Sequence, residues 1–120
     1  MEVDKGSKKT KTGKGDKMKK VIDGKLYNTD TATEISMASY GYSNDLDAWD
    51  ETLYITKNGA FFIYGSGGPA SKYGRSERQN SMSGGSEFRV VSKEDALEWC
   101  EKYVDDADEY RDYFDCIEEA

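Results

Sequence analysis

The sequence predicts an α+β fold in which an antiparallel sheet of about four to five strands is followed by two C-terminal helices. Two turn signals, Asp23-Gly24 and Asn58-Gly59, each lie between apolar segments, as is typical of β-hairpins. Apolar residues at helical spacing appear only after Ser92. The order of strands first and helices last therefore favours an antiparallel sheet over a parallel one.

The start of the chain differs in composition from the rest. Residues 1–20 carry eight lysines and three acids, a net charge of +5, among Gly, Ser and Thr. Such a segment has too little apolar surface to offset the entropy of ordering. We expect a disordered basic leader over residues 1–19 and a single α+β domain over residues 20–120. The leader is either a flexible, solubilising tail or an extension that binds nucleic acid.

The clearest strand signal is the segment around Asn58-Gly59. A two-residue turn there would pair Lys57 with Ala60, and would set Ile55 opposite Phe62. Both faces of this hairpin are apolar or aromatic, whereas a half-exposed sheet has one polar face. We therefore expect the hairpin at the centre of the sheet, with helices on one side. A shorter strand is predicted over residues 32–37, before an acidic loop with aromatic residues over 40–50.

A long polar loop follows the central hairpin, over residues 65–85, before a last strand over residues 87–91. Its opening, Gly65-Ser66-Gly67-Gly68, lacks the lysine and the following helix of a phosphate-binding loop. We expect these glycines to serve a turn that needs positive φ.

The C-terminal part predicts two helices. Ser92 is expected to cap the first, with Asp95 three positions on. Its apolar stripe comprises Ala96, Leu97, Cys100, Tyr103 and Val104. Asp105-Asp106 is expected to begin the second. The apolar face of that second helix comprises Ala107, Tyr110, Tyr113 or Phe114, and Ile117.

Composition argues against catalysis, and we expect no enzyme activity, no cofactor and no metal. The chain has no histidine, which removes the commonest general base and zinc ligand. Asp45, Asp47 and Asp50 resemble a calcium loop only loosely, because the glycine and closing glutamate of that loop are missing. Cys100 and Cys116 are expected to be reduced thiols. No apolar run approaches the roughly 20 residues of a membrane span, and we expect a cytoplasmic location.

Three groups of residues are candidates for binding a partner. Acidic residues crowd the predicted second helix, and the alternative is a merely solvated helix face. The basic loop 70–85 could contact phosphates or bases, or be a solvated loop. Aromatic residues of the loop before the central hairpin could anchor an interface, or pack internally. The acidic candidates are Asp105, Asp106, Asp108, Glu109 and Asp112; the loop candidates are Lys72, Tyr73, Arg75, Arg78 and also Arg89; the aromatic candidates are Tyr40, Tyr42 and Trp49.

Several motifs taken together resemble a family of small accessory proteins of plasmids, phages and integrative elements of Gram-positive bacteria. The resemblance covers roughly residues 19–115, and the motifs that carry it are residues 19–32, 51–62, 65–73, 80–85 and 92–99. The resemblance implies an accessory protein of a mobile genetic element with no established enzyme activity. Small acidic proteins of such elements often inhibit host defence, anti-CRISPR proteins among them, which is an analogy of setting and not of residues.

These observations predict a non-catalytic binding protein, most concretely an anti-CRISPR-type inhibitor that docks on a nucleic-acid-handling effector ribonucleoprotein. Its acidic residues would meet basic protein, while the basic loop would touch RNA or DNA. The alternative is a nucleic-acid-binding regulator that uses the lysine-rich leader and loop 70–85. The partner and the oligomeric state are left open by the sequence.

Overall fold

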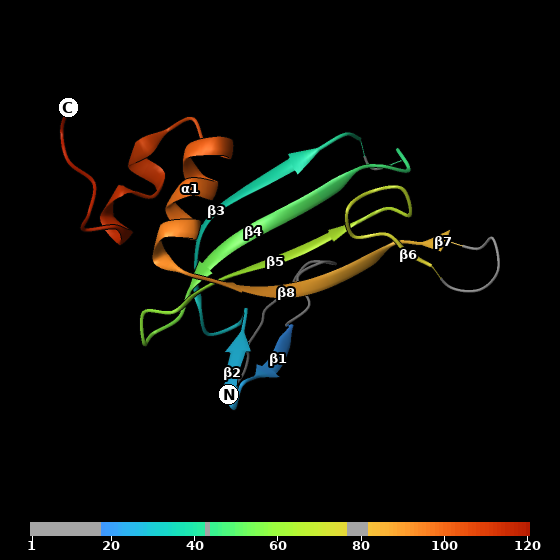
Figure 1. The fold of residues 1–120 in the computed structure, drawn as a ribbon, viewed down its shortest axis with the longest axis horizontal. Coiled ribbons are helices and arrows are strands. Elements are labelled where there is room, and N and C mark those ends of the chain that lie inside the picture. Colours follow the sequence, from blue (N-terminus) through green and yellow to red (C-terminus); the bar gives the residue numbers. More distant parts are fainter. Residues whose placement is uncertain (1–17, 43, 77–81) are drawn as a thin grey trace, which may run out of the picture.

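A four-stranded antiparallel sheet forms the centre of the molecule, with α1 lying across one of its faces (Figure 1). We describe residues 18–42, 44–76 and 82–120 from a computed structural model of the chain. The strand order is β3-β4-β5-β8, so the chain runs through the sheet as successive antiparallel neighbours. The strands are β3 (Thr33–Tyr40), β4 (Trp49–Ile55), β5 (Phe61–Gly67) and β8 (Gly85–Val91), and α1 spans Lys93–Tyr103. The predicted α+β class is confirmed.

Two small hairpins lie outside this sheet. β1 (Lys19–Ile22) pairs with β2 (Lys25–Asn28), and β6 (Arg75–Ser76) pairs with β7 (Met82–Ser83). Asp23 and Gly24 both have positive φ, 52° and 79°, which is the mirror-image turn that an Asp-Gly pair favours. The hairpin predicted at this pair is therefore confirmed.

The central hairpin of β4 and β5 has a different register from the one predicted. Ile55 pairs with Phe61 and not with Phe62, so every predicted partner is shifted by one residue. A two-residue turn requires positive φ at both central residues, but Asn58 does not have it, and only Gly59 does, at 88°. The turn is wider instead, because the Thr56 N–H donates to the Ala60 carbonyl (2.8 Å) and the Thr56 hydroxyl accepts from the Ala60 N–H (3.0 Å).

This register decides which side chains face the helix. Leu53 and Ile63 lie opposite each other on the face that α1 covers, and both are fully buried. Phe61 lies on the same face and stacks on Phe114 from the C-terminal segment, with ring centroids 5.1 Å apart. The core of buried side chains on this face comprises Ile35, Ala38, Leu53, Phe61, Ile63, Ala96, Trp99, Cys100, Tyr110 and Phe114. The expected position of the hairpin at the centre of the sheet is confirmed, and of the helices expected on one side, one, α1, is present.

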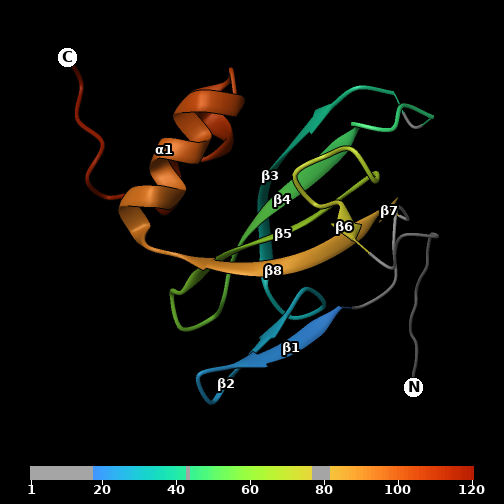
Figure 2. The ribbon, with the colours of Figure 1, turned by 45° about the vertical axis from the view of Figure 1, so that its right-hand side comes forward.

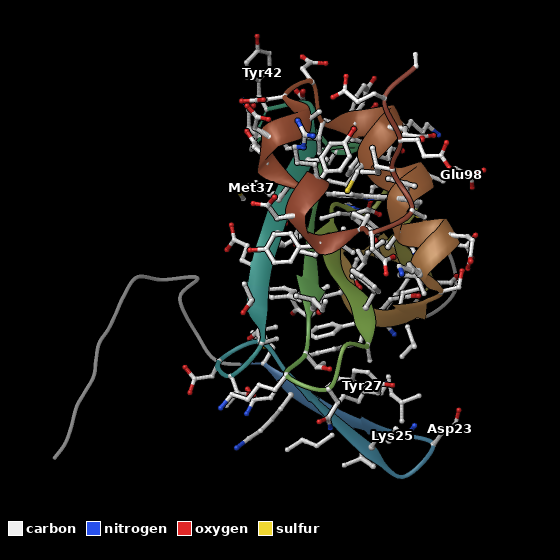
Figure 3. The ribbon with its side chains drawn as sticks, turned by 90° about the vertical axis from the view of Figure 1, so that its left-hand side faces the viewer. Asp23, Lys25, Tyr27, Met37, Tyr42 and Glu98 are labelled. Atoms are coloured by element: carbon white, nitrogen blue, oxygen red, sulfur yellow. The ribbon has the colours of Figure 1, made fainter. Side chains whose placement is uncertain are left out.

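The second face of the sheet is aromatic and only partly covered. Phe62 is fully buried there, because Tyr27 of the β1–β2 hairpin lies edge-on to its ring at 5.5 Å. Figure 2 shows this hairpin beside the end of the sheet, away from α1. Met37 and Val90 stay exposed, and Figure 3 shows Met37 pointing away from the molecule. Burial, with the charge of Glu34 adding to it, raises the pKa of Tyr54 on this face to about 12.

The first predicted helix is confirmed together with its cap. The Ser92 hydroxyl accepts a hydrogen bond from the Asp95 N–H at 3.0 Å. The predicted apolar stripe was incomplete, since Trp99 is buried at 6% exposure while Leu97 is only half-buried. Cys100 is buried and Cys116 exposed, and both are free thiols.

Replacing the cap, Ser92→Ala, is expected to lower the free energy of unfolding by about 1 kcal/mol, because the Asp95 N–H loses its acceptor. Chemical denaturation followed by circular dichroism measures the change. Ser39→Ala, at an exposed position of β3, is the matched control and should change stability by less than about 0.5 kcal/mol. Equal effects of the two variants would contradict the capping role.

The prediction of a second α-helix is wrong. Two short 3₁₀ turns take its place, η2 (Ala107–Glu109) and η3 (Arg111–Tyr113). In an α-helix, Asp105, Asp108 and Asp112 would be neighbours on one face, because they are three and four residues apart, and their carboxylates would repel one another. The side chain of Asp106 instead accepts from the Asp108 N–H (3.0 Å) and supports the tighter turn.

Candidate functional site

A buried carboxylate lies where β4 faces α1. Glu51 has no solvent exposure, although glutamate is almost never fully buried unless it is paired. It projects from the same face of β4 as Leu53, toward the helix. Five side chains, which we call the Glu51 cluster, meet at this point: Glu51, Lys72, Tyr73, Arg89 and Trp99.

Each oxygen of the Glu51 carboxylate has a partner from another part of the fold. Oε1 accepts from the Trp99 indole Nε1 of α1 at 2.8 Å. Oε2 accepts from the Tyr73 hydroxyl at 2.5 Å and from the Lys72 ammonium at 2.9 Å, both from the loop after β5. The Arg89 guanidinium of β8 lies 3.6 Å from the same oxygen. One carboxylate therefore joins the sheet, the loop and the helix.

Two glycines at the end of β5 leave room for side chains of the loop that follows this strand. A Cβ on Gly65 would lie 2.0 Å from the Tyr73 hydroxyl, so only glycine lets the Tyr73 ring cross the sheet here. A Cβ on Gly67 would lie 2.3 Å from the Ser71 hydroxyl. Neither glycine, nor Gly68, has positive φ, so the predicted need for that conformation is wrong. Close packing of backbone against side chain is the reason instead.

Two groups of the cluster, Glu51 and Tyr73, have pKa values that are shifted away from neutral pH. Burial acts to raise the pKa of Glu51, but the hydrogen bonds from Tyr73, Lys72 and Trp99 outweigh it, and the net pKa lies below its ordinary value. Burial, together with the hydrogen bond to Glu51, raises the pKa of Tyr73 well above its usual range. Glu51 is therefore a carboxylate and Tyr73 a protonated phenol, and neither changes charge at physiological pH.

The basic-loop candidates are largely engaged within the fold. Lys72 contacts Glu51 and also lies 4.1 Å from the centre of the Trp49 ring, as a cation–π pair. Tyr73 is buried, at 5% exposure. Arg75 is exposed and donates to the Ser86 carbonyl at 2.8 Å. Arg78 lies outside the described residues, as does the leader up to residue 17.

Two of the three aromatic candidates, Tyr40 and Trp49, form a short row of ring contacts that ends at solvent. Tyr40 stacks on Trp49 with ring centroids 6.2 Å apart, and Trp49 contacts Tyr103 of α1 edge-on at 5.5 Å. Tyr40 is 55% exposed and Tyr42 is 79% exposed. Gly41, with φ of 79°, turns the chain between them. The loop is held in place because the Ala70 N–H donates to the Leu46 carbonyl at 2.8 Å.

The five acidic candidates are all exposed on the segment that follows Tyr103. Tyr110 and Phe114 from this segment are buried in the core and anchor it. Glu109 accepts from the Ser36 hydroxyl of β3 at 2.7 Å, and Asp108 lies 3.7 Å from Arg111. Tyr103 precedes this segment and contacts Trp49, which in turn stacks on Tyr40. We call the exposed acidic candidates and the exposed tyrosines together the acidic–aromatic surface, which comprises Tyr40, Tyr42, Asp105, Asp106, Asp108, Glu109 and Asp112.

A cleft of about 530 Å³ lies between α1 and the sheet, above the Glu51 cluster. Its walls come from β4, β5, β8, the loop after β5, and one side of α1. Its volume falls within the range of small-molecule sites. The lining residues are Glu51, Ile63, Lys72, Arg89, Val91, Asp95, Glu98, Trp99, Lys102 and Tyr103.

Glu51 was not among the residues predicted from the sequence to be functional, although a signal was available. Glu51, Leu53 and Ile55 alternate along β4, and alternation places all three on one face. A charged residue at the inward position of a central strand predicts a buried, paired carboxylate. Its partners Lys72, Arg89 and Trp99 come from three other segments, and no local pattern connects them.

Comparison with known proteins gives no relative: no protein-family model matches the chain, and no significant match occurs among the curated proteins or the solved structures. Within the described residues, no group of three or more His, Cys, Asp or Glu side chains is placed to hold a metal ion. None of the helices in this part of the chain has the length and apolarity to cross a membrane. The geometry defines a domain with a buried polar cluster and an exposed acidic–aromatic surface.

Proposed function

We propose that this protein is a non-catalytic binding protein that docks through the acidic–aromatic surface on a basic protein surface. The observation that carries the proposal is the set of exposed carboxylates on the anchored C-terminal segment, together with the exposed Tyr40 and Tyr42 at the end of β3. Tyrosines supply large contact area at protein interfaces, and the carboxylates complement a positive patch. Because Tyr110 and Phe114 hold the segment on the core, little of its conformational freedom is lost on binding.

The partner class that this chemistry fits is a protein complex that handles nucleic acid, since such complexes carry basic grooves. The resemblance to accessory proteins of mobile genetic elements supports an inhibitor of host defence, of the anti-CRISPR type. In this role the carboxylates occupy a groove that would otherwise hold RNA or DNA phosphates. Residues Lys72 and Tyr73 favour this protein-docking function over the alternative of a nucleic-acid-binding regulator, because both are held by Glu51.

Charge reversal tests the docking surface. The triple variant Asp105→Lys, Asp108→Lys and Asp112→Lys should abolish inhibition of DNA cleavage by the purified effector ribonucleoprotein that the wild-type chain inhibits. The design leaves Asp106, which supports the η2 turn, and Glu109, which binds Ser36, unchanged. Circular dichroism checks that the variant is folded.

The matched control makes the same change of net charge at exposed positions elsewhere, Asp30→Lys, Glu34→Lys and Glu87→Lys. The control should inhibit as the wild type does. Unchanged inhibition by the surface variant would exclude docking through these carboxylates. Absence of inhibition by the wild-type chain across a panel of effector types would overturn the inhibitor function itself, and binding to free RNA or DNA that falls steeply with salt would support the regulator.

A further inference from the structure

The cleft between α1 and β8 has two charged walls of opposite sign. On the sheet side, Lys72 and Arg89 bring two positive charges against the single negative charge of Glu51. Their side chains are 41% and 40% exposed. Both therefore line the cleft while their charged groups lie close to the buried carboxylate of Glu51. This wall is therefore positive and has N–H donors left over after Glu51 is satisfied, because an arginine carries five and a lysine three.

The facing wall is one side of α1. Asp95 and Glu98 line the cleft one turn apart, and both are exposed. Figure 3 shows Glu98 on the side of the molecule opposite to Met37, that is, away from β3. Neither carboxylate forms an ion pair within 4.0 Å with a described residue. Lys102 lines the cleft further along α1, and its ammonium lies over the Tyr103 ring at 5.1 Å.

Apolar and aromatic side chains lie between the charged walls. Ile63 and Val91 come from the sheet, and Trp99 and Tyr103 from the helix. The Trp99 indole N–H is already used by Glu51, so the ring offers only its apolar surface to the cleft. A ligand that fits these walls has an anionic group, a cationic group and an apolar part.

We propose that the cleft binds a small zwitterion of the α-amino acid class with an apolar side chain. Its carboxylate lies against Arg89 and Lys72, its ammonium lies against Glu98 and Asp95, and its side chain contacts Trp99 and Tyr103. This site is separate from the acidic–aromatic surface, and the proposal does not depend on docking to a protein partner.

Titration calorimetry of the full chain with L-phenylalanine tests the site, with two truncated probes beside it. The first, 3-phenylpropanoate, lacks the ammonium group; the second, 2-phenylethylammonium, lacks the carboxylate. L-Phenylalanine should bind at least about tenfold more tightly than either, because each probe leaves one charged wall without a partner.

Two variants test which charged group of the ligand each wall of the cleft binds. Glu98→Gln should weaken binding of L-phenylalanine and of 2-phenylethylammonium by about tenfold each, and leave binding of 3-phenylpropanoate unchanged. Arg89→Gln should weaken L-phenylalanine and 3-phenylpropanoate instead. Glu98 has no ion-pair partner to lose among the described residues, so that variant remains informative even if Arg89→Gln unfolds. Glu94→Gln, exposed on α1 and outside the cleft, is the control and should bind as the wild type does.

The proposal would be overturned if neither L-phenylalanine nor any other apolar amino acid gave a heat of binding at millimolar concentration. Binding that neither Glu98→Gln nor Arg89→Gln alters would overturn it as well, since the ligand would then lie elsewhere.

Discussion

Glu51→Ala is expected to lower the free energy of unfolding by about 3–4 kcal/mol. The substitution removes the acceptor of the Trp99 indole N–H and of the Tyr73 hydroxyl, which are both buried groups. A buried donor without a partner costs its full desolvation free energy. Lys72 and Arg89 lose less, because each is two-fifths exposed and can turn to water. Urea denaturation, followed by tryptophan fluorescence, measures the change.

The control is Glu34→Ala, which removes an exposed carboxylate from the neighbouring strand β3. We expect it to change stability by less than about 0.5 kcal/mol. If the two variants were equally stable, Glu51 would not be the residue that joins sheet, loop and helix.

The effect of Glu51→Ala should also depend on pH, with a definite sign. The pKa of Glu51 is lower in the folded chain than its ordinary value of 4.5. Its contribution is therefore fully present above about pH 4.5 and is lost as the pH falls through the lower, folded-state pKa. The stability difference between wild type and variant should stay constant from pH 7 to about 5 and shrink below that. A difference that grew on acidification would contradict an ionised, hydrogen-bonded Glu51.

Gly65→Ala is expected to destabilise the fold by about 3 kcal/mol. The new Cβ would lie 2.0 Å from the Tyr73 hydroxyl and 2.3 Å from its ring carbon, so the ring has to leave its position. The hydrogen bond to Glu51 is lost with it, and the loop after β5 loses its buried anchor. Ser66→Ala, at the next position of the same strand, loses only an exposed hydrogen bond to Asp50 and should cost far less.

A double-mutant cycle shows whether the collision with Tyr73 is the cause. If it is, Gly65→Ala should cost little in a chain that already carries Tyr73→Ala, because the ring is no longer there to be displaced. Additive effects would mean that the β5 backbone itself rejects a side chain at this position. Proton exchange at the loop amides, measured by NMR, gives a second readout, since loss of the anchor should speed exchange there without global unfolding.

Local patterns predicted the elements of this fold well where the signal lies within a few residues. The Asp23-Gly24 turn, the Ser92 cap and the first helix depend on neighbouring residues and are confirmed. The second helix was predicted from apolar spacing, but crowded carboxylates and the Asp106 side chain favour 3₁₀ turns. The predicted register of β4 and β5 was wrong because the Asn58-Gly59 pair is compatible with turns of two lengths. The hydrogen bond from the Ala60 N–H to the Thr56 hydroxyl favours the longer turn.

The candidate binding residues show the same difference between features that depend on neighbouring residues and features that depend on distant ones. Acidic charge and exposed tyrosines could be found in the sequence, because composition and periodicity report which residues stay outside a core. Lys72 and Tyr73 had the composition of a basic contact loop, yet the fold directs both at Glu51. Composition reports the charge of a side chain and says nothing of its partner when that partner lies 21 or 22 positions away.

The sequence by itself determined the α+β class, the central place of β4 and β5, and the strongly acidic character of the C-terminal segment. These three features depend on local periodicity and on summed charge, which are the same however the elements are arranged in space. Only the tertiary structure decided that Glu51 is a buried centre, that Trp49 lies between Tyr40 and Tyr103, and that α1 and the sheet enclose a cleft with charges of both signs. Each of these needs residues from at least two distant segments to meet, and chain folding alone brings them together.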